Sequence, residues 1–262
     1  MTKRLLTGRR SALNIAAICL GLLAAVGMFC WPLFASREIA QQSGLAQAGF
    51  TLLMPALVAL VLVQVTNGRL DSRRLAVLGV LAALASVIRM LGAGTAGIET
   101  IFFLILIGGF VFGADFGFLL GSTSLLTSAL FTGGFGPWLP FQMMAAGLVG
   151  LMAGTLPRFK RKWLEISLLT VFAIVASYFY GALMTLWNWP FLAGSGTSIS
   201  YVAGAPLLAN LERFITFEIV TGGLIWDLGR AVTTVILVLL TAPALQATLS
   251  RVARRAGYET KL

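Results

Sequence analysis

The sequence predicts an all-α integral membrane protein with about eight transmembrane helices, and three observations support this fold class. Hydrophobic residues make up 58% of the 262 residues and charged residues only 11%, which is too apolar for a soluble domain. Eight windows of 15 or more residues are apolar enough to form membrane helices. Basic residues gather in groups between alternate windows, as they do in multi-pass proteins.

The distribution of basic residues predicts the topology. Fifteen of the 19 basic residues lie in four groups: Lys3, Arg4, Arg9 and Arg10; Arg69, Arg73 and Arg74; Arg158, Lys160, Arg161 and Lys162; and Arg251, Arg254, Arg255 and Lys261. If eight helices alternate in direction, all four groups lie on one side. The positive-inside rule then places both termini in the cytoplasm of a multi-pass plasma-membrane protein. The net charge of +10 therefore indicates topology, with membrane lipid as a partner and no role for nucleic acid.

Residues 1–72 are predicted to form an N-terminal extension with two transmembrane helices. The first, Ser11–Ala35, is too long an apolar run for a signal peptide and has no small residue where cleavage would require one. The second, Phe50–Thr66, returns to the turn Asn67-Gly68.

Residues 73–262 are predicted to form a six-helix substrate-binding core. The expected spans are Leu75–Leu91, Glu99–Gly113, Asp115–Thr132, Leu139–Leu156, Trp163–Leu186 and Leu224–Leu245. A glycine-rich loop, Gly92–Gly97, joins the first two. The pattern between Asn210 and Leu245 is too long for one span, so we expect a surface or re-entrant helix that ends at Gly222-Gly223.

Small residues recur at steps of four through the central three spans. They are Gly109, Gly113, Gly117 and Gly121, followed by Ala146, Gly150 and Gly154. Such faces allow helix backbones to approach closely in lipid, so these spans should pack tightly against one another. Asp115, at the turn between two of them, is expected to be a helix N-cap.

Charged side chains in the outer halves of the predicted spans are candidates for function. Asp227 and Arg230 are spaced to face the same way on the last helix, and Arg89 lies one turn inside the end of its span. One interpretation is structural: Asp227 pairs with Arg230, and Arg89 bonds Glu99. The other places these groups at the floor of an outward-open cup, because charges within a span are functional candidates.

Aromatic rings and amides also gather at the outer level. They are Trp138, Gln142, Trp187, Asn188, Trp189 and Asn210. Flat apolar faces with a few amides suit a ring-containing ligand taken from outside, although membrane anchoring is the alternative for each ring.

Several functional classes lack the residues they would need. The sequence contains no phosphate-binding Gly-x-x-x-x-Gly-Lys-[Ser/Thr] loop, no histidine and only two cysteines, Cys19 and Cys30. No nucleophile–base pair or metal-ligand spacing is present. We therefore expect neither an enzyme nor a cofactor or metal site, and any ATP-driven step requires a partner.

Three stretches resemble the substrate-binding S components of energy-coupling factor (ECF) transporters. They are Leu81–Ala85, Gly108–Gly121 and Thr132–Gln142, within a similarity over residues 73–250. The run Gly136-Pro137-Trp138-x-Pro140-Phe141-Gln142 and the run Trp187-x-Trp189-Pro190 look most like the cobalamin-type S components. The first two helices are a departure from the minimal family pattern.

The resemblance implies a vitamin bound in an outward cup and a lid formed by the Gly92–Gly97 loop. It also implies a transmembrane coupling (T) subunit and two ATPase (A) subunits as partners. The matching T-subunit face is the small-residue set Gly79, Ala82, Ala83 and Ala85, although packing within the chain is the alternative.

The resulting hypothesis is capture of cobalamin or a related corrinoid. Expected ligand contacts are Arg89, Thr95, Glu99, Trp138, Gln142, Trp187, Asn188, Trp189, Asn210, Asp227 and Arg230. Riboflavin or thiamine are alternative vitamins. An ion-coupled secondary transporter, with Asp227, Arg230 and Glu218 as its site, and a membrane scaffold are the other classes considered.

Overall fold

The secondary structure in the described part of the chain is entirely helical, which confirms the predicted fold class. The computed structural model describes residues 19–34, 54–56, 58–59, 63, 72–92, 97–194 and 196–255. After the helical segment Cys19–Phe29, its elements are α2 (Trp31–Phe34), α5 (Ser72–Gly92), α6 (Phe102–Phe112), α7 (Ala114–Thr132), α8 (Leu139–Thr155), α9 (Lys162–Leu186), α10 (Trp189–Leu192), α11 (Leu207–Val220) and α12 (Gly223–Arg255).

Four of the described helices, α5, α7, α9 and α12, are long and apolar enough to cross a membrane. The helices α6 and α8 and the segment Cys19–Phe29 are apolar but shorter. At 1.5 Å per residue, α6 is about 16 Å long, roughly half the thickness of a bilayer core. The expected count of eight transmembrane helices is therefore not confirmed.

The boundaries of the central helices agree closely with the sequence prediction. The break at Gly222-Gly223 is also confirmed, because Gly222 has a φ of 81° and α12 begins at the next residue. Two details differ. The last helix continues past Pro243 to Arg255, well beyond the expected end. Asp115 is not the N-cap of α7; Gly113 holds that position, and Asp115 lies in the first turn, where its charge complements the helix dipole.

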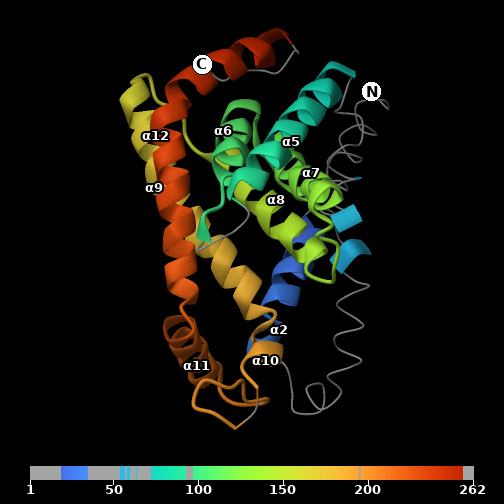
Figure 1. Ribbon diagram of the computed structural model, residues 1–262, viewed down its shortest axis with the longest axis vertical. Helices are drawn as coiled ribbons and strands as arrows, with labels where there is room; N and C mark the ends of the chain where they lie inside the picture. Colours follow the sequence, from blue (N-terminus) through green and yellow to red (C-terminus); the bar gives the residue numbers. More distant parts are fainter. Residues whose placement is uncertain are drawn as a thin grey trace, which may run out of the picture.

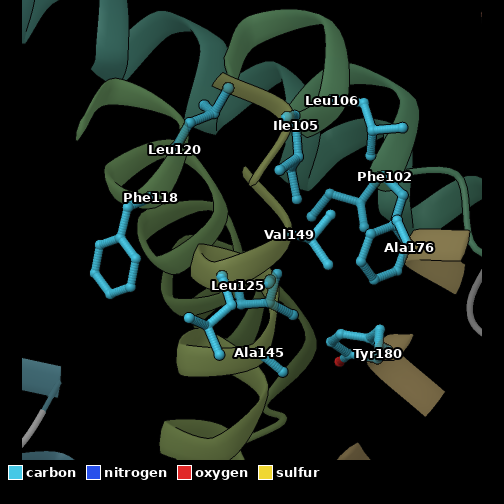
Figure 2. Packing of buried hydrophobic residues seen from close by; sticks show 14 of the residues in the cluster. Phe102, Ile105, Leu106, Phe118, Leu120, Leu125, Ala145, Val149, Ala176 and Tyr180 are labelled. Atoms are coloured by element: carbon cyan, nitrogen blue, oxygen red, sulfur yellow. The ribbon is translucent and has the colours of Figure 1, made fainter. Parts of the chain in front are cut away.

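The helices α6, α7 and α8 pack with their backbones in contact. A Cβ atom on Gly117 would overlap the Gly150 carbonyl, and one on Gly121 would overlap the Ala146 carbonyl. This close approach is what the four-residue spacing predicts. Figure 2 shows buried apolar side chains of these helices, among them Leu106, Leu120 and Val149. We call α6–α8 the glycine core.

The two ends of the bundle are formed by different helices, and one end carries basic residues. In Figure 1, α10 and α11 lie at one end and the last turns of α12 at the other. Arg73 Nη1 donates a hydrogen bond to the Arg255 carbonyl (3.4 Å), so the start of α5 lies beside the end of α12. We call this the basic end. Two of the four basic groups thus meet there, whereas the group at residues 3–10 lies outside the described residues.

The described parts of the N-terminal extension pack into the same core as the other helices. Ala25, Phe29 and Met54 are each fully buried there. The boundary between residues 1–72 and 73–262 remains a prediction, and the second predicted helix, Phe50–Thr66, lies largely outside the described residues.

Candidate functional site

The most concentrated group of buried charges surrounds Arg230 on α12. Its guanidinium donates to the Glu99 carboxylate (Nε to Oε2, 2.7 Å), to Asp227 (Nη1 to Oδ1, 2.5 Å) and to the Ser177 carbonyl (3.2 Å). Only 7% of Arg230 is exposed. A charge buried to this extent is tolerated only when it is paired and hydrogen-bonded, as it is here.

The neighbouring helices supply aromatic walls for this guanidinium. The ring of Tyr180 on α9 lies 4.9 Å from the guanidinium carbon, and the ring of Phe102 on α6 lies 5.8 Å from it. The two rings meet edge to face at 4.7 Å, as Figure 2 shows. Both rings are in range for cation–π attraction, which adds to the ion pairs.

Two glycines bring the carboxylates to Arg230. Gly97 has a φ of 77°, and a Cβ there would overlap the Trp226 carbonyl, so the segment that carries Glu99 packs directly on the first turn of α12. A Cβ on Gly181 of α9 would overlap the carboxylate of Asp227. Neither approach is possible for a residue with a side chain unless the backbone shifts.

Glu218 on α11 is a third carboxylate at this place and is 5% exposed. The Thr185 side chain hydrogen-bonds it, and it interacts electrostatically with Asp227 and Arg230. Its Oε1 atom is buried and has no hydrogen-bond partner among the described residues. Burial raises the pKa of Glu218 and nearby Asp227 raises it further, against the lowering effects of Thr185 and Arg230.

We call this set the arginine cluster: Glu99, Ser177, Tyr180, Glu218, Asp227 and Arg230. It combines three carboxylates with one guanidinium that is already bonded to two of them. Within the described residues, no group of three or more His, Cys, Asp or Glu side chains is arranged to hold a metal ion. Because its carboxylates outnumber its guanidinium group, the cluster can accept hydrogen bonds from a ligand or bind a positively charged one.

Arg89 takes a different partner from the one expected in the structural interpretation. Its Nη1 donates to the Ser128 hydroxyl on α7 (3.1 Å), and Glu99 is bonded by Arg230 instead. The expected Asp227–Arg230 contact is present. Arg89 still lies within electrostatic range of Tyr180, so it belongs to the surroundings of the cluster.

Residues 187–220, which we call the cap, carry four of the predicted ligand contacts. Trp189 is fully buried and donates from Nε1 to the Ile199 carbonyl (2.9 Å). Asn210 bonds both backbone groups of Val202, at 2.9 and 3.2 Å. Asn188 is half-buried at the start of α10. The side chains of Trp189 and Asn210 thus hold the cap together.

The remaining predicted contacts differ in exposure. Trp187 is buried, and its ring stacks on Phe141 of α8 at 3.9 Å with an interplanar angle of 7°. Its indole Nε1 is buried and has no partner among the described residues. Trp138 is 45% exposed and Gln142 is half-buried. Thr95, and most of the predicted lid, lie outside the described residues.

The small residues predicted to contact a T subunit divide between two faces of α5. Ala82 and Ala85 are buried, and α5 packs chiefly against α7. Gly79 and Ala83 are exposed, and a Cβ on Gly79 would meet no atom within 4 Å. The first pair therefore packs inside the chain, and the second is available to another protein or to lipid.

Sequence reasoning did not identify Ser177 and Tyr180 as members of the cluster or Gly181 as the residue that leaves room for Asp227, and it named Glu218 only in the ion-coupled alternative. Ser177, Tyr180 and Gly181 lie at three- and four-residue spacings, on one face of α9. That spacing is the only indication in the sequence, and it is also typical of ordinary helix packing.

The family model for the ECF transporter, substrate-specific component, matches residues 73–248, which run from α5 into α12. The chain belongs to this family. No curated protein and no solved structure is a significant match to it.

As an ECF substrate-specific component, the chain is a membrane transport subunit rather than an enzyme. Proteins of this family bind a small-molecule substrate and work with T and A subunits. The match leaves the segment Cys19–Phe29 and α2 outside the family region.

Proposed function

We propose that this ECF component captures cobalamin or a related corrinoid from outside the cell for ATP-driven uptake. The single observation that most supports a ligand site is the unpaired Oε1 of Glu218, which is buried where α11 of the cap meets the rest of the arginine cluster. A buried acceptor without a partner is costly, and a ligand donor would remove that cost. Corrinoids carry several peripheral amide groups that could donate to it.

The choice of cobalamin rests on the resemblance of the Gly136–Gln142 and Trp187–Pro190 stretches to cobalamin-type S components. The two stretches meet where the ring of Phe141 stacks on that of Trp187, and α10, which follows Trp187, lies at the end of the bundle opposite the basic end (Figure 1). By the positive-inside rule this end faces outward, so the ligand enters from outside and both termini are cytoplasmic. Trp138 offers an exposed ring for it.

The proposed ligand contacts keep the predicted set and divide it by role. Trp138, Gln142 and Asn188 are the exposed or half-buried groups that would touch a ligand first. Glu99, Asp227 and Arg230 with Arg89 form the charged floor, to which the structure adds Glu218, and Trp187, Trp189 and Asn210 belong to the cap. Thr95 remains a proposal from the sequence.

A cationic ring vitamin such as thiamine is the second candidate. The observation in its favour is the excess of carboxylates over guanidinium groups in the arginine cluster, which suits a positive ligand. An ion-coupled secondary transporter would use Glu218, Asp227 and Arg230 without ATPase subunits. Membership of the ECF family argues against this alternative, because proteins of that family work with A subunits.

The test is to purify the full chain from cells grown in rich medium and to record its absorbance spectrum and the mass of any bound ligand. A corrinoid spectrum and mass would support the proposal. Bound thiamine or riboflavin would overturn cobalamin alone. Purification without A or T subunits from a strain that contains them would favour the ion-coupled alternative.

A further inference from the structure

The N-terminal segment that lies outside the family region packs against the cap through α2. Trp31 of α2 donates from its indole Nε1 to the Trp187 carbonyl (2.9 Å), across 156 residues of sequence. Its ring also lies 5.9 Å from the ring of Phe191 and 6.0 Å from that of Tyr201. The Trp31 side chain therefore contacts the cap at three places: the Trp187 carbonyl, Phe191 of α10 and Tyr201 in the loop that follows α10.

A second contact joins the same segment to the wall of the bundle. Phe29 is fully buried and meets the ring of Phe141 edge to face at 5.4 Å. Phe141 is the residue on which Trp187 stacks. The end of α9 is thus fixed from two sides, by the hydrogen bond from Trp31 and by the ring stack that Phe29 supports.

A third contact reaches α11. Leu33 packs on a buried apolar group made by Leu186, Trp189, Phe214 and Phe217. In Figure 1, α2 lies beside α10 at the cap end of the bundle. Phe214 and Phe217 are the two buried rings of α11.

The anchored face of α11 also carries the unsatisfied carboxylate of the arginine cluster. Phe214, Phe217 and Glu218 are spaced by three and four residues, so they project from one face of the helix. Holding the two rings fixes the rotation of α11. That rotation decides whether the Glu218 carboxylate faces Asp227 and Arg230.

We propose that Trp31 and Leu33 are positioning residues of the ligand site. They hold the cap, including its helix α11, so that Glu218 stays in the arginine cluster. The N-terminal extension is then part of the substrate-binding unit and completes a site whose other residues lie in the family region. The ligand part of this inference rests on the proposed function, whereas the placement of α11 does not.

The test compares Leu33→Ala with the conservative Leu33→Met and with the control Leu23→Ala, a position on the same segment that is 68% exposed. Trp31→Phe is a second variant that keeps an aromatic ring but loses the hydrogen-bond donor and part of the ring contact with Phe191 and Tyr201. Two quantities are measured on the full chain: hydrogen–deuterium exchange of residues 207–220, and the dissociation rate of cyanocobalamin.

We expect Leu33→Ala and Trp31→Phe to raise amide exchange in α11 by roughly fivefold, the size expected for one lost contact or hydrogen bond. Exchange in α6–α8 should stay unchanged, and cyanocobalamin should dissociate roughly fivefold faster. Leu33→Met should restore both quantities, and Leu23→Ala should alter neither.

Unchanged exchange in α11 would overturn the inference, and so would an equal rise in α6–α8, which would mean a general loss of stability. A rise confined to α11 with an unchanged dissociation rate would also overturn it, because α11 would then not position the ligand site. If wild-type protein binds no cyanocobalamin, the cobalamin proposal fails, and exchange in α11 still tests whether α2 holds it.

Discussion

The glycine core and the arginine cluster are both buried, but they are built in opposite ways. In the glycine core, backbones touch at Gly117 and Gly150, and side chains fill only the surroundings. In the arginine cluster, three separate stretches of chain meet at the Arg230 guanidinium, through the Glu99 carboxylate, the Ser177 carbonyl and the Asp227 carboxylate. The core holds helices at a fixed distance, whereas the cluster depends on charge balance and on how its supporting helices are turned.

This difference suggests that the glycine core chiefly stabilises the fold, whereas the arginine cluster also takes part in ligand binding. Backbone contacts have few alternative arrangements, because any shift brings carbonyl groups into overlap. Side-chain ion pairs can exchange partners when a ligand offers donors or charge. We therefore expect substitutions in the core to change stability first and substitutions in the cluster to change ligand binding as well.

The largest effect is expected for Gly117→Val. The added side chain would overlap the Gly150 carbonyl, which cannot move without displacing α8. Destabilisation should reach about 3 kcal/mol, the upper end of the typical range for overpacking. Thermal unfolding in detergent measures it. The matched control Gly79→Ala, on the exposed face of α5, should unfold at the wild-type temperature or slightly above; equal losses in both variants would contradict backbone packing.

Arg230→Met should be the next largest, with a loss of about 3–5 kcal/mol, because Glu99 and Asp227 would remain buried without their partner. The triple variant Arg230→Met with Glu99→Gln and Asp227→Asn should recover much of that stability. Ligand binding should stay lost in both variants. Denaturant or thermal unfolding, with binding measured in parallel, distinguishes the two effects; restored binding in the triple variant would show that the charges are structural only.

The third prediction concerns pH. Because the folded pKa of Glu218 is raised above its ordinary value of 4.5, the folded state binds more protons and its stability is greatest below that value. Stability should fall as the pH rises from 4.5 through the folded pKa, because the unfolded state loses this proton before the folded state does. Glu218→Gln, which imitates the protonated group, should flatten the unfolding temperature over this range. An unchanged pH profile would mean that Glu218 is not buried against Asp227.

Trp138→Ala should affect binding more than stability. The side chain is 45% exposed, so the change in unfolding free energy should stay within about 0.5 kcal/mol. Ligand affinity should fall roughly tenfold if the ring stacks on the ligand, as an equilibrium binding assay would show. Trp163→Ala, at the start of α9 and 59% exposed, is the control and should leave affinity unchanged. Equal affinities in both variants would assign Trp138 to membrane anchoring.

The smallest effect on the isolated chain is expected for Ala83→Leu. Ala83 is exposed on α5, so stability should be unchanged, whereas co-purification with the T subunit should decrease if this face makes the contact. Ala82→Leu is the comparison, because Ala82 is buried within the chain and the larger side chain should destabilise the fold itself. Wild-type co-purification in Ala83→Leu would place the T-subunit contact elsewhere.

The sequence predicted the glycine core well and the arginine cluster only in part, for a physical reason. Gly109, Gly117 and Gly150 act through local periodicity, which a single sequence contains. The cluster joins Glu99 to Arg230 across 131 residues. The sequence suggested Arg89 as the partner of Glu99, whereas the packing of Gly97 on α12 brings Glu99 to Arg230.

The cap shows a second limit of prediction from sequence: residue types can indicate important positions without fixing their roles. Trp187, Trp189 and Asn210 were chosen because rings and amides suit a ligand, yet much of their hydrogen bonding and stacking serves the cap itself. The role of Trp31 could not be read from the sequence, since its partner is a backbone carbonyl at Trp187, which any residue would provide.

The most direct test of the ligand site is native mass spectrometry of wild-type protein and Glu218→Met, which removes both acceptor oxygens at similar volume, each purified from cells supplied with cyanocobalamin. Wild-type protein should carry one corrinoid per chain, and Glu218→Met should retain only a small fraction of that occupancy while unfolding at a similar temperature. Equal occupancy in the two proteins would show that the arginine cluster does not bind the ligand and would contradict this account.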